Sequence, residues 1–510
     1  MPPRSSLPRI CIALGLPDPE RLIEHAEREA EAGERFLEFR LDYLPTPESG
    51  FAVIRKFLSR HPDCGILATC RRHQNHGRFN GSIEEQLSIL SGAIDAGARA
   101  IDIEIESAES LPQGLHRFEG RVLLVLSYHN FEGTPALDPV LKRMIRFPAA
   151  AYKIVTTARK PSDNWRVLNL ARTYPKTPLI LLAMGEVGFP TRVLSLLYGG
   201  QYSYAAPAAA VGTAAGQVAA RQLRNLYRAE KLSRAARIYG VIADPVRHSI
   251  SPAVHNRAMQ ARRLDALYLP FLVQPLQLKD FFTLAEKLPI QGFSVTIPHK
   301  QKILRYLDSI DSLARRIGAV NTVWRKAGKW RGANTDSEGI RVPLARHIRL
   351  NEKTRVLVVG NGGSARSAAF TLSDAKARLS IVGRNPDRVR ALAKLVGAEP
   401  LSREQAEAGN FDVLIHATPL GMWPHSEECF FADRIPASLV FDLVYTPQET
   451  TLLRRGREQG AEVIHGLEMF LEQAAAQFQI FTGESAPRVA MHQAALEALG
   501  AQVAGNNGKP

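Results

Sequence analysis

The sequence predicts an α/β chain in which an N-terminal (β/α)8 barrel precedes a unit that contains a Rossmann dinucleotide-binding fold. Three observations lead to this prediction. The chain has 510 residues, more than one hydrophobic core usually serves. Its first part alternates apolar, β-rich runs with amphipathic segments eight times. Its second part carries a strand, a glycine-rich turn and a helix start in succession, VLVVGNGGSARSAAF at 356–370.

Composition narrows the class of protein. The 45% hydrophobic and 23% charged residues are ordinary for a globular protein. No run of about 18 apolar residues and no signal-peptide pattern occurs, so we expect a cytoplasmic protein without a membrane span. The four cysteines contain no CxxC pair, which argues against a metal site and a disulfide frame. The net charge of +15 is spread along the chain, so we expect small anionic substrates rather than nucleic acid.

The predicted barrel occupies the chain from residue 8 to about 232. Most of its strands are separated by room for a helix, for example at 20–33 and 83–97. In barrels of this kind catalytic side chains lie at the C-terminal ends of the strands. The eight predicted strands are Ile10–Leu14, Arg35–Asp42, Gly65–Arg71, Ala100–Ile105, Arg121–His129, Ala151–Thr156, Pro178–Met184 and Ser203–Pro207.

Polar residues interrupt several of these strands. Lys153 stands within the apolar run AAYKIVTTA (150–158). Residues two apart in a strand share a face, and helices cover the outer face of a barrel strand. An inward position is therefore favoured over an exposed salt bridge. The polar residues expected to point into the barrel are Glu38, Arg40, Arg71, Asp102, Glu104, His129 and Lys153.

This group of side chains suits imine chemistry. Desolvation and cationic neighbours favour a neutral lysine amine, which can attack a ketone. The resulting iminium acidifies the adjacent carbon, and a histidine can remove that proton and protonate a leaving hydroxide. Arginines can hold a substrate carboxylate. Taken alone, His129 is equally compatible with a structural role.

The first half resembles the type I 3-dehydroquinate dehydratases. The matching segments are FLEFRLD (36–42), TCRR (69–72), SYHNF (127–131), YKIVTTA (152–158), AMGEVGFPTR (183–192) and TAAGQ (213–217). The resemblance implies that Lys153 forms the Schiff base and that His129 is the general acid and base. It also implies a set of substrate-binding residues: Glu38, Arg40, Arg71, Arg192, Thr213 and Gln217.

Two positions depart from that family. Thr213 stands where the family usually has a serine, a change that keeps the hydroxyl. Asn75 stands where the family commonly has a carboxylate that supports the catalytic histidine. An amide can orient the imidazole of His129 but brings no negative charge to stabilise its protonated form. We therefore expect Asn75 to lie beside His129 and to leave it with a lower pKa than a carboxylate would.

Beyond a polar linker at 231–240, short apolar strands are predicted to end in polar residues. Lys300, Asn321 and Asp336 would converge on a polyol site with a proton-transfer pair. Ser249 and Ser251 precede a proline at a helix start, where their hydroxyls would be exposed. Helix capping is the alternative role for Ser251.

The glycine-rich turn predicts a dinucleotide site. Glycines there let the backbone approach a pyrophosphate at a helix N-terminus. A second strand at 379–385 leads into Arg384 and Arg388, where an NAD enzyme would carry an acid, so NADP is the expected cofactor. The alternative is that Arg384 is a solvated loop residue.

The second half resembles the shikimate dehydrogenases, through the motifs above and through HATPLGM (416–422), FDLVYTPQETTLL (441–453) and GLEMFLEQAA (466–475). The resemblance implies a two-lobed unit with Lys300 and Asp336 as the catalytic pair. The substrate contacts that it implies are Ser249, Ser251, Thr296, Asn321, Asp336, Tyr445 and Gln473. The NADP contacts are Gly360, Asn361, Gly362, Gly363, Ser364, Ala365, Arg384, Asn385 and Arg388.

Together the two resemblances imply a bifunctional enzyme of the shikimate pathway. It would dehydrate 3-dehydroquinate to 3-dehydroshikimate, then reduce that to shikimate with NADPH and without a metal. The expected domains are 1–232, a substrate lobe 236–347 completed by 474–505, and an NADP-binding domain 348–473. One alternative is a catabolic enzyme acting on quinate. Another is a metabolite-binding regulator, which is disfavoured because Lys153, His129, Lys300 and Asp336 are all present. No pattern in the sequence specifies an oligomeric state.

Overall fold

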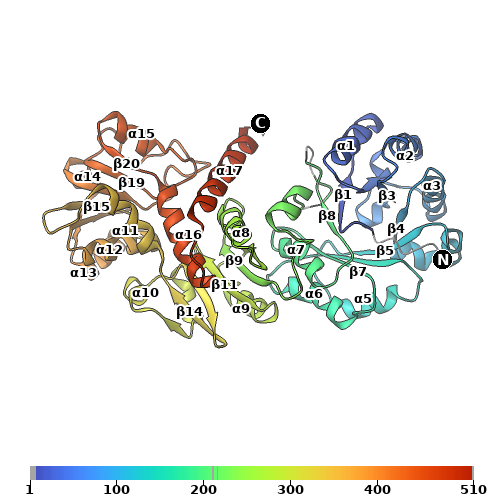
Figure 1. Ribbon diagram of the computed structural model, residues 1–510, viewed down its shortest axis with the longest axis horizontal. Helices are drawn as coiled ribbons and strands as arrows, with labels where there is room; N and C mark the ends of the chain where they lie inside the picture. Colours follow the sequence, from blue (N-terminus) through green and yellow to red (C-terminus); the bar gives the residue numbers. More distant parts are fainter. Residues whose placement is uncertain (1–6, 209–211, 215, 508–510) are drawn as a thin grey trace. The chain divides into compact units, whose positions relative to one another are not determined.

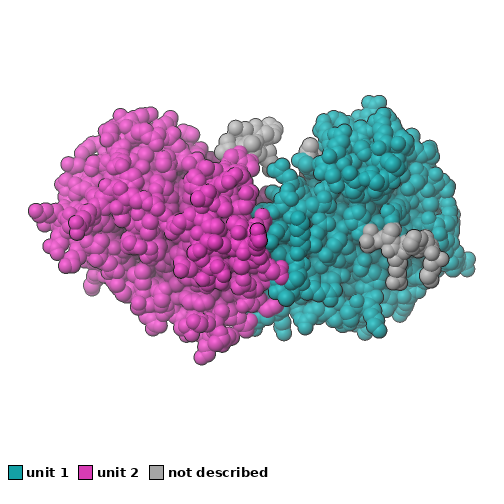
Figure 2. Space-filling model, in the orientation of Figure 1, with its two compact units in different colours: residues 1–236, 271–273, 279–288 teal, residues 237–270, 274–278, 289–510 magenta. Residues whose placement is uncertain are grey.

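The computed structural model describes residues 7–208, 212–214 and 216–507. The chain forms two compact units, coloured separately in Figure 2. The division falls after Ala236, within the stretch predicted as a linker, and the next residue opens the first strand of the second unit. Unit 1 comprises Met1–Ala236, Phe271–Val273 and Lys279–Leu288, and unit 2 comprises Arg237–Pro270, Gln274–Leu278 and Pro289–Pro510.

The first sheet has eight strands in the order β7-β6-β5-β4-β3-β2-β1-β8, and every strand pairing described along it is parallel. Several of these strands, among them β1 and β8, are labelled in Figure 1. The backbone N–H of Gln201, just before β8, donates to the carbonyl of Leu179 in β7 at 2.8 Å, so the two outermost strands meet. The predicted eight-stranded barrel is confirmed. The strands are β1 (Ile10–Leu14), β2 (Phe36–Arg40), β3 (Gly65–Thr69), β4 (Ala100–Glu104), β5 (Leu123–His129), β6 (Ala151–Thr157), β7 (Leu179–Met184) and β8 (Ser203–Ala205).

Helices alternate with these strands. The two helices predicted by residue range form as expected: Asp18 caps α1, and Ser82 and Glu85 form a capping box on α3. The second predicted strand is shorter than expected, because a 3-10 turn begins at Leu41. The helices of the barrel region are α1 (Pro19–Glu31), α2 (Ser49–Arg60), α3 (Ile83–Asp95), α4 (Ile105–Ser110), α5 (Leu137–Met144), α6 (Asp163–Thr173) and α7 (Phe189–Leu197). Short 3-10 helices span Leu41–Tyr43, His73–Asn75 and Pro112–Phe118, and a π-helix spans Gln222–Leu226.

A cluster of buried side chains fills the inside of the barrel. Ala151 and Val155 of β6 belong to it, together with Tyr202 and with Tyr204 of β8. Because successive side chains of a strand point to opposite faces, Lys153, two residues from each of those β6 positions, also faces inward. The alternation of the strand thus brings a lysine into an apolar interior.

The second sheet, of six strands, is mixed. Its order is β10-β9-β11-β13-β14-β12, with β11 parallel to β9 but antiparallel to β13. Asn321 therefore precedes a strand instead of ending one, contrary to the prediction. Reversal of β13 still brings its start to the edge where β11 ends. The elements are β9 (Arg237–Ala243), β10 (Ala266–Leu272), β11 (Ile290–Val295), β12 (Ser309–Ile310), β13 (Thr322–Lys326), β14 (Lys329–Ala333), α8 (Ser251–Ala261), α9 (Leu278–Lys287), a 3-10 helix (Lys302–Tyr306) and α10 (Ser312–Ile317).

The third sheet is parallel throughout, in the order β17-β16-β15-β18-β19-β20. Numbered along the chain, this is the 3-2-1-4-5-6 order of a Rossmann fold, so that prediction is confirmed. The elements are β15 (Arg355–Val359), β16 (Arg378–Val382), β17 (Glu399–Pro400), β18 (Phe411–His416), β19 (Ala437–Asp442), β20 (Glu462–Ile464), α11 (Asp336–His347), α12 (Gly363–Asp374), α13 (Pro386–Val396), α14 (Arg403–Ala408), α15 (Thr451–Glu458), α16 (Gly466–Thr482) and α17 (Arg488–Asn507).

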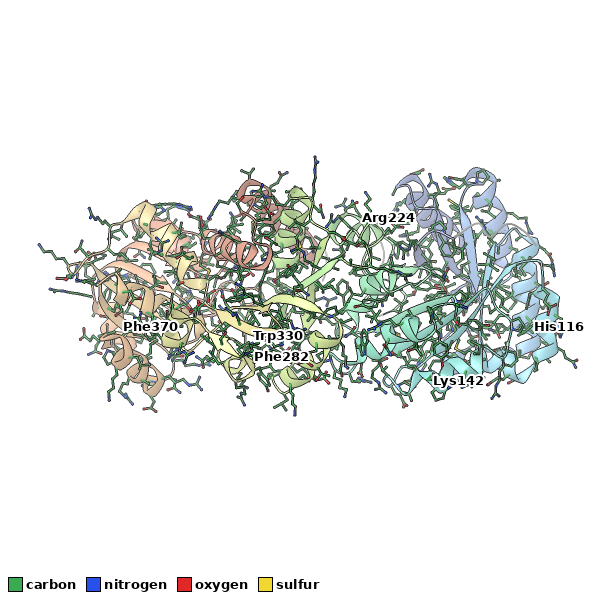
Figure 3. The ribbon with its side chains drawn as sticks, turned by 60° about the horizontal axis from the view of Figure 1, so that its bottom comes forward. His116, Lys142, Arg224, Phe282, Trp330 and Phe370 are labelled. Atoms are coloured by element: carbon green, nitrogen blue, oxygen red, sulfur yellow. The ribbon has the colours of Figure 1, made fainter. Side chains whose placement is uncertain are left out.

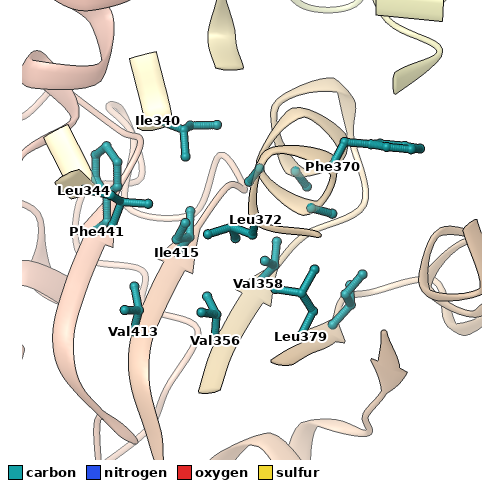
Figure 4. Packing of buried hydrophobic residues seen from close by; sticks show 14 of the residues in the cluster. Ile340, Leu344, Val356, Val358, Phe370, Leu372, Leu379, Val413, Ile415 and Phe441 are labelled. Atoms are coloured by element: carbon teal, nitrogen blue, oxygen red, sulfur yellow. The ribbon is translucent and has the colours of Figure 1, made fainter. Parts of the chain in front are cut away.

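One face of the third sheet packs on α11 and α12 (Figure 4). Val358 of β15 and Ile415 of β18 meet Leu372 of α12 and Ile340 of α11 in one buried cluster. Small residues dominate the start of α12, which lets that helix approach the sheet closely. This packing fixes the position of the glycine-rich turn between β15 and α12.

Helix α16, after the third sheet in the chain, returns to the second sheet. The hydroxyl of Tyr239 in β9 donates to the carbonyl of Phe481 in α16 at 2.7 Å. On the same sheet Phe293 of β11 packs edge-to-face on Trp330 of β14, labelled in Figure 3, at 5.5 Å between ring centroids. Within the ranges that the structure describes, no helix has the length and apolar character of a membrane span. The same residues contain no cluster of three acidic, histidine or cysteine side chains arranged to bind a metal.

Candidate active sites

Lys153 lies at the centre of the barrel site. It is 5% exposed, and its Nζ donates to Asp102 Oδ2 at 2.9 Å and to the hydroxyl of Tyr204 at 3.0 Å. Oε1 of Glu38 is 3.9 Å from the same nitrogen, and Thr69 donates to that carboxylate. The arrangement buries a primary amine among groups that can accept and return protons. It can therefore support attack on a carbonyl.

Asp102 connects the cations of this site. Its carboxylate accepts from Arg71 at 2.8 Å, from Ser127 at 2.6 Å and from Lys153. Burial alone would raise the pKa of Asp102, but the Arg71 and Lys153 cations outweigh burial and hold that pKa well below its usual range. Asp102 therefore stays ionised in the folded protein and balances two buried positive charges.

His129, at the end of β5, borders a cavity of about 180 Å³. Its Nδ1 lies 3.1 Å from a guanidinium nitrogen of Arg71. An arginine only donates, so Nδ1 accepts, and the neutral ring carries its proton on Nε2. Burial, followed by the nearby Arg71 and Lys153 charges, lowers the pKa of His129 well below its usual value. The histidine is thus held neutral.

The other expected dehydratase residues lie at the same end of the barrel. Arg40 pairs bidentately with Asp42, at 2.8 and 2.9 Å, and packs over the ring of Tyr43. Arg192, on α7, is 1% exposed and reaches toward the carbonyl of Tyr204 at 3.5 Å; burial lowers its pKa to about 10.

Thr213 and Gln217 lie on the loop that follows β8. A Cβ on Gly15, the residue after β1, would come within 2.9 Å of the Thr213 methyl group. Gln217 Nε2 is 3.5 Å from the Thr213 hydroxyl. Both residues are therefore near the end of β1 at which the polar side chains of the barrel gather. Ala215 of the matching segment is outside the described residues.

Asn75 has a different partner from the one expected. Its side-chain amide donates to Glu106 Oε2 at 3.1 Å, and Arg143 holds the same carboxylate at 3.1 Å. Asn75 and His129 line the same cavity, yet the nitrogen of His129 whose contact is seen faces Arg71. A cation, Arg71, thus lies against the histidine, and the carboxylate that Asn75 contacts is Glu106, the second residue of α4.

In unit 2, Lys300 and Asp336 form an ion pair. Asp336 is the first residue of α11, and its other oxygen accepts from Asn321 Nδ2 at 2.7 Å. The Asn321 side chain is fixed in turn by the backbone N–H of Thr335, which donates to its Oδ1 at 2.8 Å. The three residues predicted to converge do so. A lysine and a carboxylate in contact can pass a proton to a developing alkoxide.

The expected substrate contacts come from neighbouring loops and from α16. Asn321 Nδ2 is 3.4 Å from Gln473 Oε1. Ser249 and Thr296 follow β9 and β11, whose carboxyl ends are adjacent because these strands pair in parallel. Ser249 accepts from the N–H of Ser251 at 3.3 Å, so Ser249 orders this loop, and Ser251 begins α8 without capping it. Tyr445 packs against Phe470 in a tilted arrangement, with 5.1 Å between ring centroids, and burial raises the pKa of Tyr445 to about 12.

The glycine-rich turn is open where a dinucleotide would lie. Gly360 has a φ of +128°, and a Cβ there would come within 2.8 Å of the Ala417 carbonyl. A Cβ on Gly362 would meet nothing within 4 Å. No side chain caps the N-terminus of α12, so its first N–H groups remain available to an anion. Ser364 and Ala365 belong to this first turn.

The two arginines after β16 are exposed. Arg384 makes no ion pair with any described residue. The backbone N–H of Arg388 donates to the Asn385 side chain, which caps α13. Asn361 reaches the Asn385 carbonyl at 3.4 Å, so the turn and the arginine-bearing loop are neighbours. This surface suits a phosphate on the ribose side of a dinucleotide.

Sequence reasoning placed Asp102 inside the barrel without giving it a role, and it did not identify Tyr204 or Ser127. Asp102 shares a strand face with Glu104, a pattern that the sequence did show, and both prove to be buried. Tyr204 could have been found from its position in the last barrel strand, two residues from a second tyrosine. Ser127 gave no separate signal, because a serine in a strand is common.

Comparisons with known protein families match both parts of the chain. Residues 10–234 match the family model described as type I 3-dehydroquinase. Residues 241–323 match the shikimate dehydrogenase substrate binding domain, 344–421 the shikimate/quinate 5-dehydrogenase model, and 466–496 the shikimate 5'-dehydrogenase C-terminal domain.

Whole proteins with both parts are also similar. The chloroplastic bifunctional 3-dehydroquinate dehydratase/shikimate dehydrogenase of Arabidopsis thaliana is 32% identical over 94% of this chain and 83% of its own. The shikimate biosynthesis protein AroDE of Chlamydia pneumoniae is 34% identical over 75% of this chain and 78% of its own. A crystal structure of a shikimate dehydrogenase in complex with NADP+ is 35% identical, with a TM-score of 0.50 over 52% of this chain and 97% of that one.

The fold and the two sites define a two-enzyme chain, a lyase barrel joined to an oxidoreductase with a Rossmann domain. The chain belongs to the family of bifunctional 3-dehydroquinate dehydratase/shikimate dehydrogenases.

Proposed function

We propose that the barrel converts 3-dehydroquinate to 3-dehydroshikimate through an imine on Lys153. The buried lysine with Asp102 and Tyr204 around it is the observation that carries this proposal. The amine condenses with the ketone and releases water, and the iminium acidifies the adjacent carbon. His129 takes that carbon's proton and protonates the departing hydroxide, and hydrolysis then frees the product and Lys153.

The remaining polar residues of the barrel bind the substrate in this proposal. Arg192 is a buried cation whose pKa is already lowered by desolvation, so a substrate carboxylate beside it would be stabilised strongly. Arg40, Arg71 and Glu38 lie around the reacting centre, and Thr213 and Gln217 close it from the loop after β8.

The second unit reduces 3-dehydroshikimate to shikimate in this proposal. The Lys300–Asp336 pair supplies the proton to the ketone oxygen, with Asn321 orienting Asp336. Ser249, Ser251, Thr296, Tyr445 and Gln473 bind the ring substituents and the carboxylate. The substrates, 3-dehydroquinate, 3-dehydroshikimate and shikimate, are small anions, in keeping with the net charge of +15.

NADP(H) supplies the hydride and fits the residues present. The turn at Gly360–Ala365 leaves open space at Gly362 and an uncapped helix N-terminus for the pyrophosphate. Arg384, Asn385 and Arg388 would hold the 2′-phosphate. NADP-dependent relatives such as the shikimate dehydrogenase of Bacillus cereus, 38% identical over 52% of this chain, support this choice.

We also propose the domain limits 1–232, 236–347 with 474–505, and 348–473. Packing of α16 and α17 beside the second sheet and α8 supports assigning 474–505 to the substrate lobe. A reducing compartment, the cytoplasm, suits four free cysteines, although the Arabidopsis relative is named as chloroplastic.

The direct test is incubation of the chain with 3-dehydroquinate and NADPH while NADPH absorbance and shikimate are followed together. We expect both signals to change in parallel. Lys153→Met should stop conversion of 3-dehydroquinate and its trapping by borohydride, but still allow reduction of added 3-dehydroshikimate. Lys300→Met should stop the reduction of 3-dehydroshikimate but still allow the dehydration of 3-dehydroquinate. Loss of both activities in either variant would contradict separate sites.

A further inference from the structure

The hydroxyl of Ser364 connects the dinucleotide turn to the proposed proton-transfer pair. Ser364 lies in the first turn of α12, and its Oγ accepts a hydrogen bond from Lys300 Nζ at 3.1 Å. A Cβ on the preceding residue, Gly363, would come within 3.0 Å of Cδ of Lys300. Lys300 can thus lie close to this turn because Gly363 has no side chain and because the Ser364 hydroxyl accepts its hydrogen bond.

The hydrogen bonds of Lys300 leave one donor for a ligand. An ammonium group has three N–H donors and accepts nothing. Among the described residues, Nζ contacts Asp336 from α11 and Ser364 from α12. Asp336 is itself held by Asn321 at 2.7 Å, and the neighbouring His299 is fully buried. Because two N–H donors of Lys300 are bound to residues of α11 and α12, the third N–H donor has a defined direction.

We propose that Ser364 is a positioning residue that orients the ammonium of Lys300 toward the substrate oxygen. This inference rests on the proposed dehydrogenase function. A lysine fixed in this way has less freedom to lose before proton transfer than one held by Asp336 alone. Because Ser364 belongs to the turn proposed to hold NADP, it also links that turn to the reacting centre.

The test uses the full chain without cofactor. Modification of Lys300 by an amine-reactive reagent at one fixed pH, followed by mass spectrometry, reports how readily that amine leaves its hydrogen bonds. Ser364→Ala and Ser364→Gly both remove the hydroxyl and should speed the modification several-fold, roughly the effect of one lost hydrogen bond. Ser364→Thr keeps a hydroxyl and should retain the original rate. Ser373→Ala is the matched control, since Ser373 is also on α12 but donates to the Val396 carbonyl at 3.0 Å.

Turnover gives a second readout. With NADP+ and shikimate, the two hydroxyl-free variants should lose kcat several-fold, and Ser364→Thr should retain it. An unchanged modification rate in both hydroxyl-free variants would overturn the inference, as would an equal change in Ser373→Ala. Failure of the unmodified chain to oxidise shikimate would instead overturn the proposed function, because the modification of Lys300 is measured without turnover.

Discussion

Asp102 determines the charge balance of the barrel site. It accepts hydrogen bonds from Arg71 and Lys153, both almost fully buried, so its loss would leave two cations without their shared counter-ion. Removing one partner of a buried ion pair typically costs about 3–5 kcal/mol of stability. Asp102→Asn should therefore destabilise the barrel by about that amount, seen as faster hydrogen exchange in β4–β6. Asp95→Asn, at an exposed carboxylate, is the control and should have little effect.

The same residue predicts a dependence on pH. The folded-state pKa of Asp102 lies below the usual value of about 3.9, so the ionised form stabilises the fold above that pH. This contribution is lost as the pH falls toward the folded-state pKa. The stability difference between the unmodified chain and Asp102→Asn should thus be largest near neutral pH and shrink below about pH 4. A difference that grows on acidification would contradict the assignment.

Arg384 should decide between the two nicotinamide cofactors. It is exposed beside the dinucleotide turn and makes no ion pair with a described residue, so its charge is available to a 2′-phosphate. Arg384→Ala should raise the KM for NADPH at least tenfold, the effect of about 1.4 kcal/mol, while the KM for NADH changes little. Arg390→Ala is a suitable control, because Arg390 pairs with Asp387. Equal effects on both cofactors would rule out this role.

The two serines before α8 bear on the choice of substrate. Ser249 and Ser251 resemble the pair that binds the shikimate carboxylate in the related dehydrogenases. We therefore expect kcat/KM for oxidation of shikimate to exceed that for quinate by tenfold or more, the effect of about 1.4 kcal/mol. Steady-state kinetics on both compounds with NADP+ would check this. A quinate value equal to the shikimate value would favour the catabolic alternative.

For Asn75 the sequence predicted the location of the residue but not its partner. A family motif gave its position, and Asn75 does line the cavity together with His129. Its partner, Glu106, comes from the start of α4, about thirty residues further along the chain. The sequence alone does not show that the carboxylate of Glu106, in α4, lies next to the side-chain amide of Asn75. The low pKa expected for His129 agrees with the structure, but its causes are burial and the cations Arg71 and Lys153.

Among the elements, the turn between β15 and α12 is the most constrained by its backbone. Gly360→Ala would place a methyl group against the Ala417 carbonyl at a positive φ, which should destabilise unit 2 by roughly 1–3 kcal/mol. Gly362→Ala is the matched control, since its φ is −81° and no atom lies within 4 Å of the added carbon. Thermal inactivation of the dehydrogenase should separate the variants, with the dehydratase as an internal standard. Equal stability of Gly360→Ala and Gly362→Ala would contradict the claim that the backbone at Gly360 requires a glycine.

Strand prediction succeeded where pairing is parallel and failed where it is not. In a parallel sheet every strand ends at the same edge, so polar residues at strand ends can be grouped without knowing the order of strands. The eight barrel strands and the β15–β16 pair followed that rule. In the second sheet, β13 runs against β11, and Asn321 reaches the site from the start of its strand. Apolar periodicity does not distinguish these directions.

For the whole molecule, the sequence predicted two halves with separate chemistry. The main division of the structure falls after Ala236, and two short later segments, Phe271–Val273 and Lys279–Leu288, are grouped with the first unit. Each half has its own sheets and its own buried clusters, because its apolar residues recur at the periods of its own strands and helices. The prediction of two halves rested on chain length, apolar periodicity and the glycine-rich turn. The strand order of the mixed second sheet could not be predicted, because pairing between strands far apart in the sequence does not affect the local residue pattern.

The pairing of β1 with β8 determines when the barrel can close during synthesis. The first strand of the barrel finds its second neighbour only after about residue 205 has been made, and Ile10 to Ile12 then align with Ser203 to Ala205. In the other half, the hydrogen bond from Tyr239 of β9 to the Phe481 carbonyl can form only after residue 481 has been synthesised. Because domains generally fold as they emerge from the ribosome, the dehydratase can be complete while most of the dehydrogenase is still untranslated. The order of the two reactions in the proposed pathway is thus also the order in which a ribosome delivers the enzymes that catalyse them.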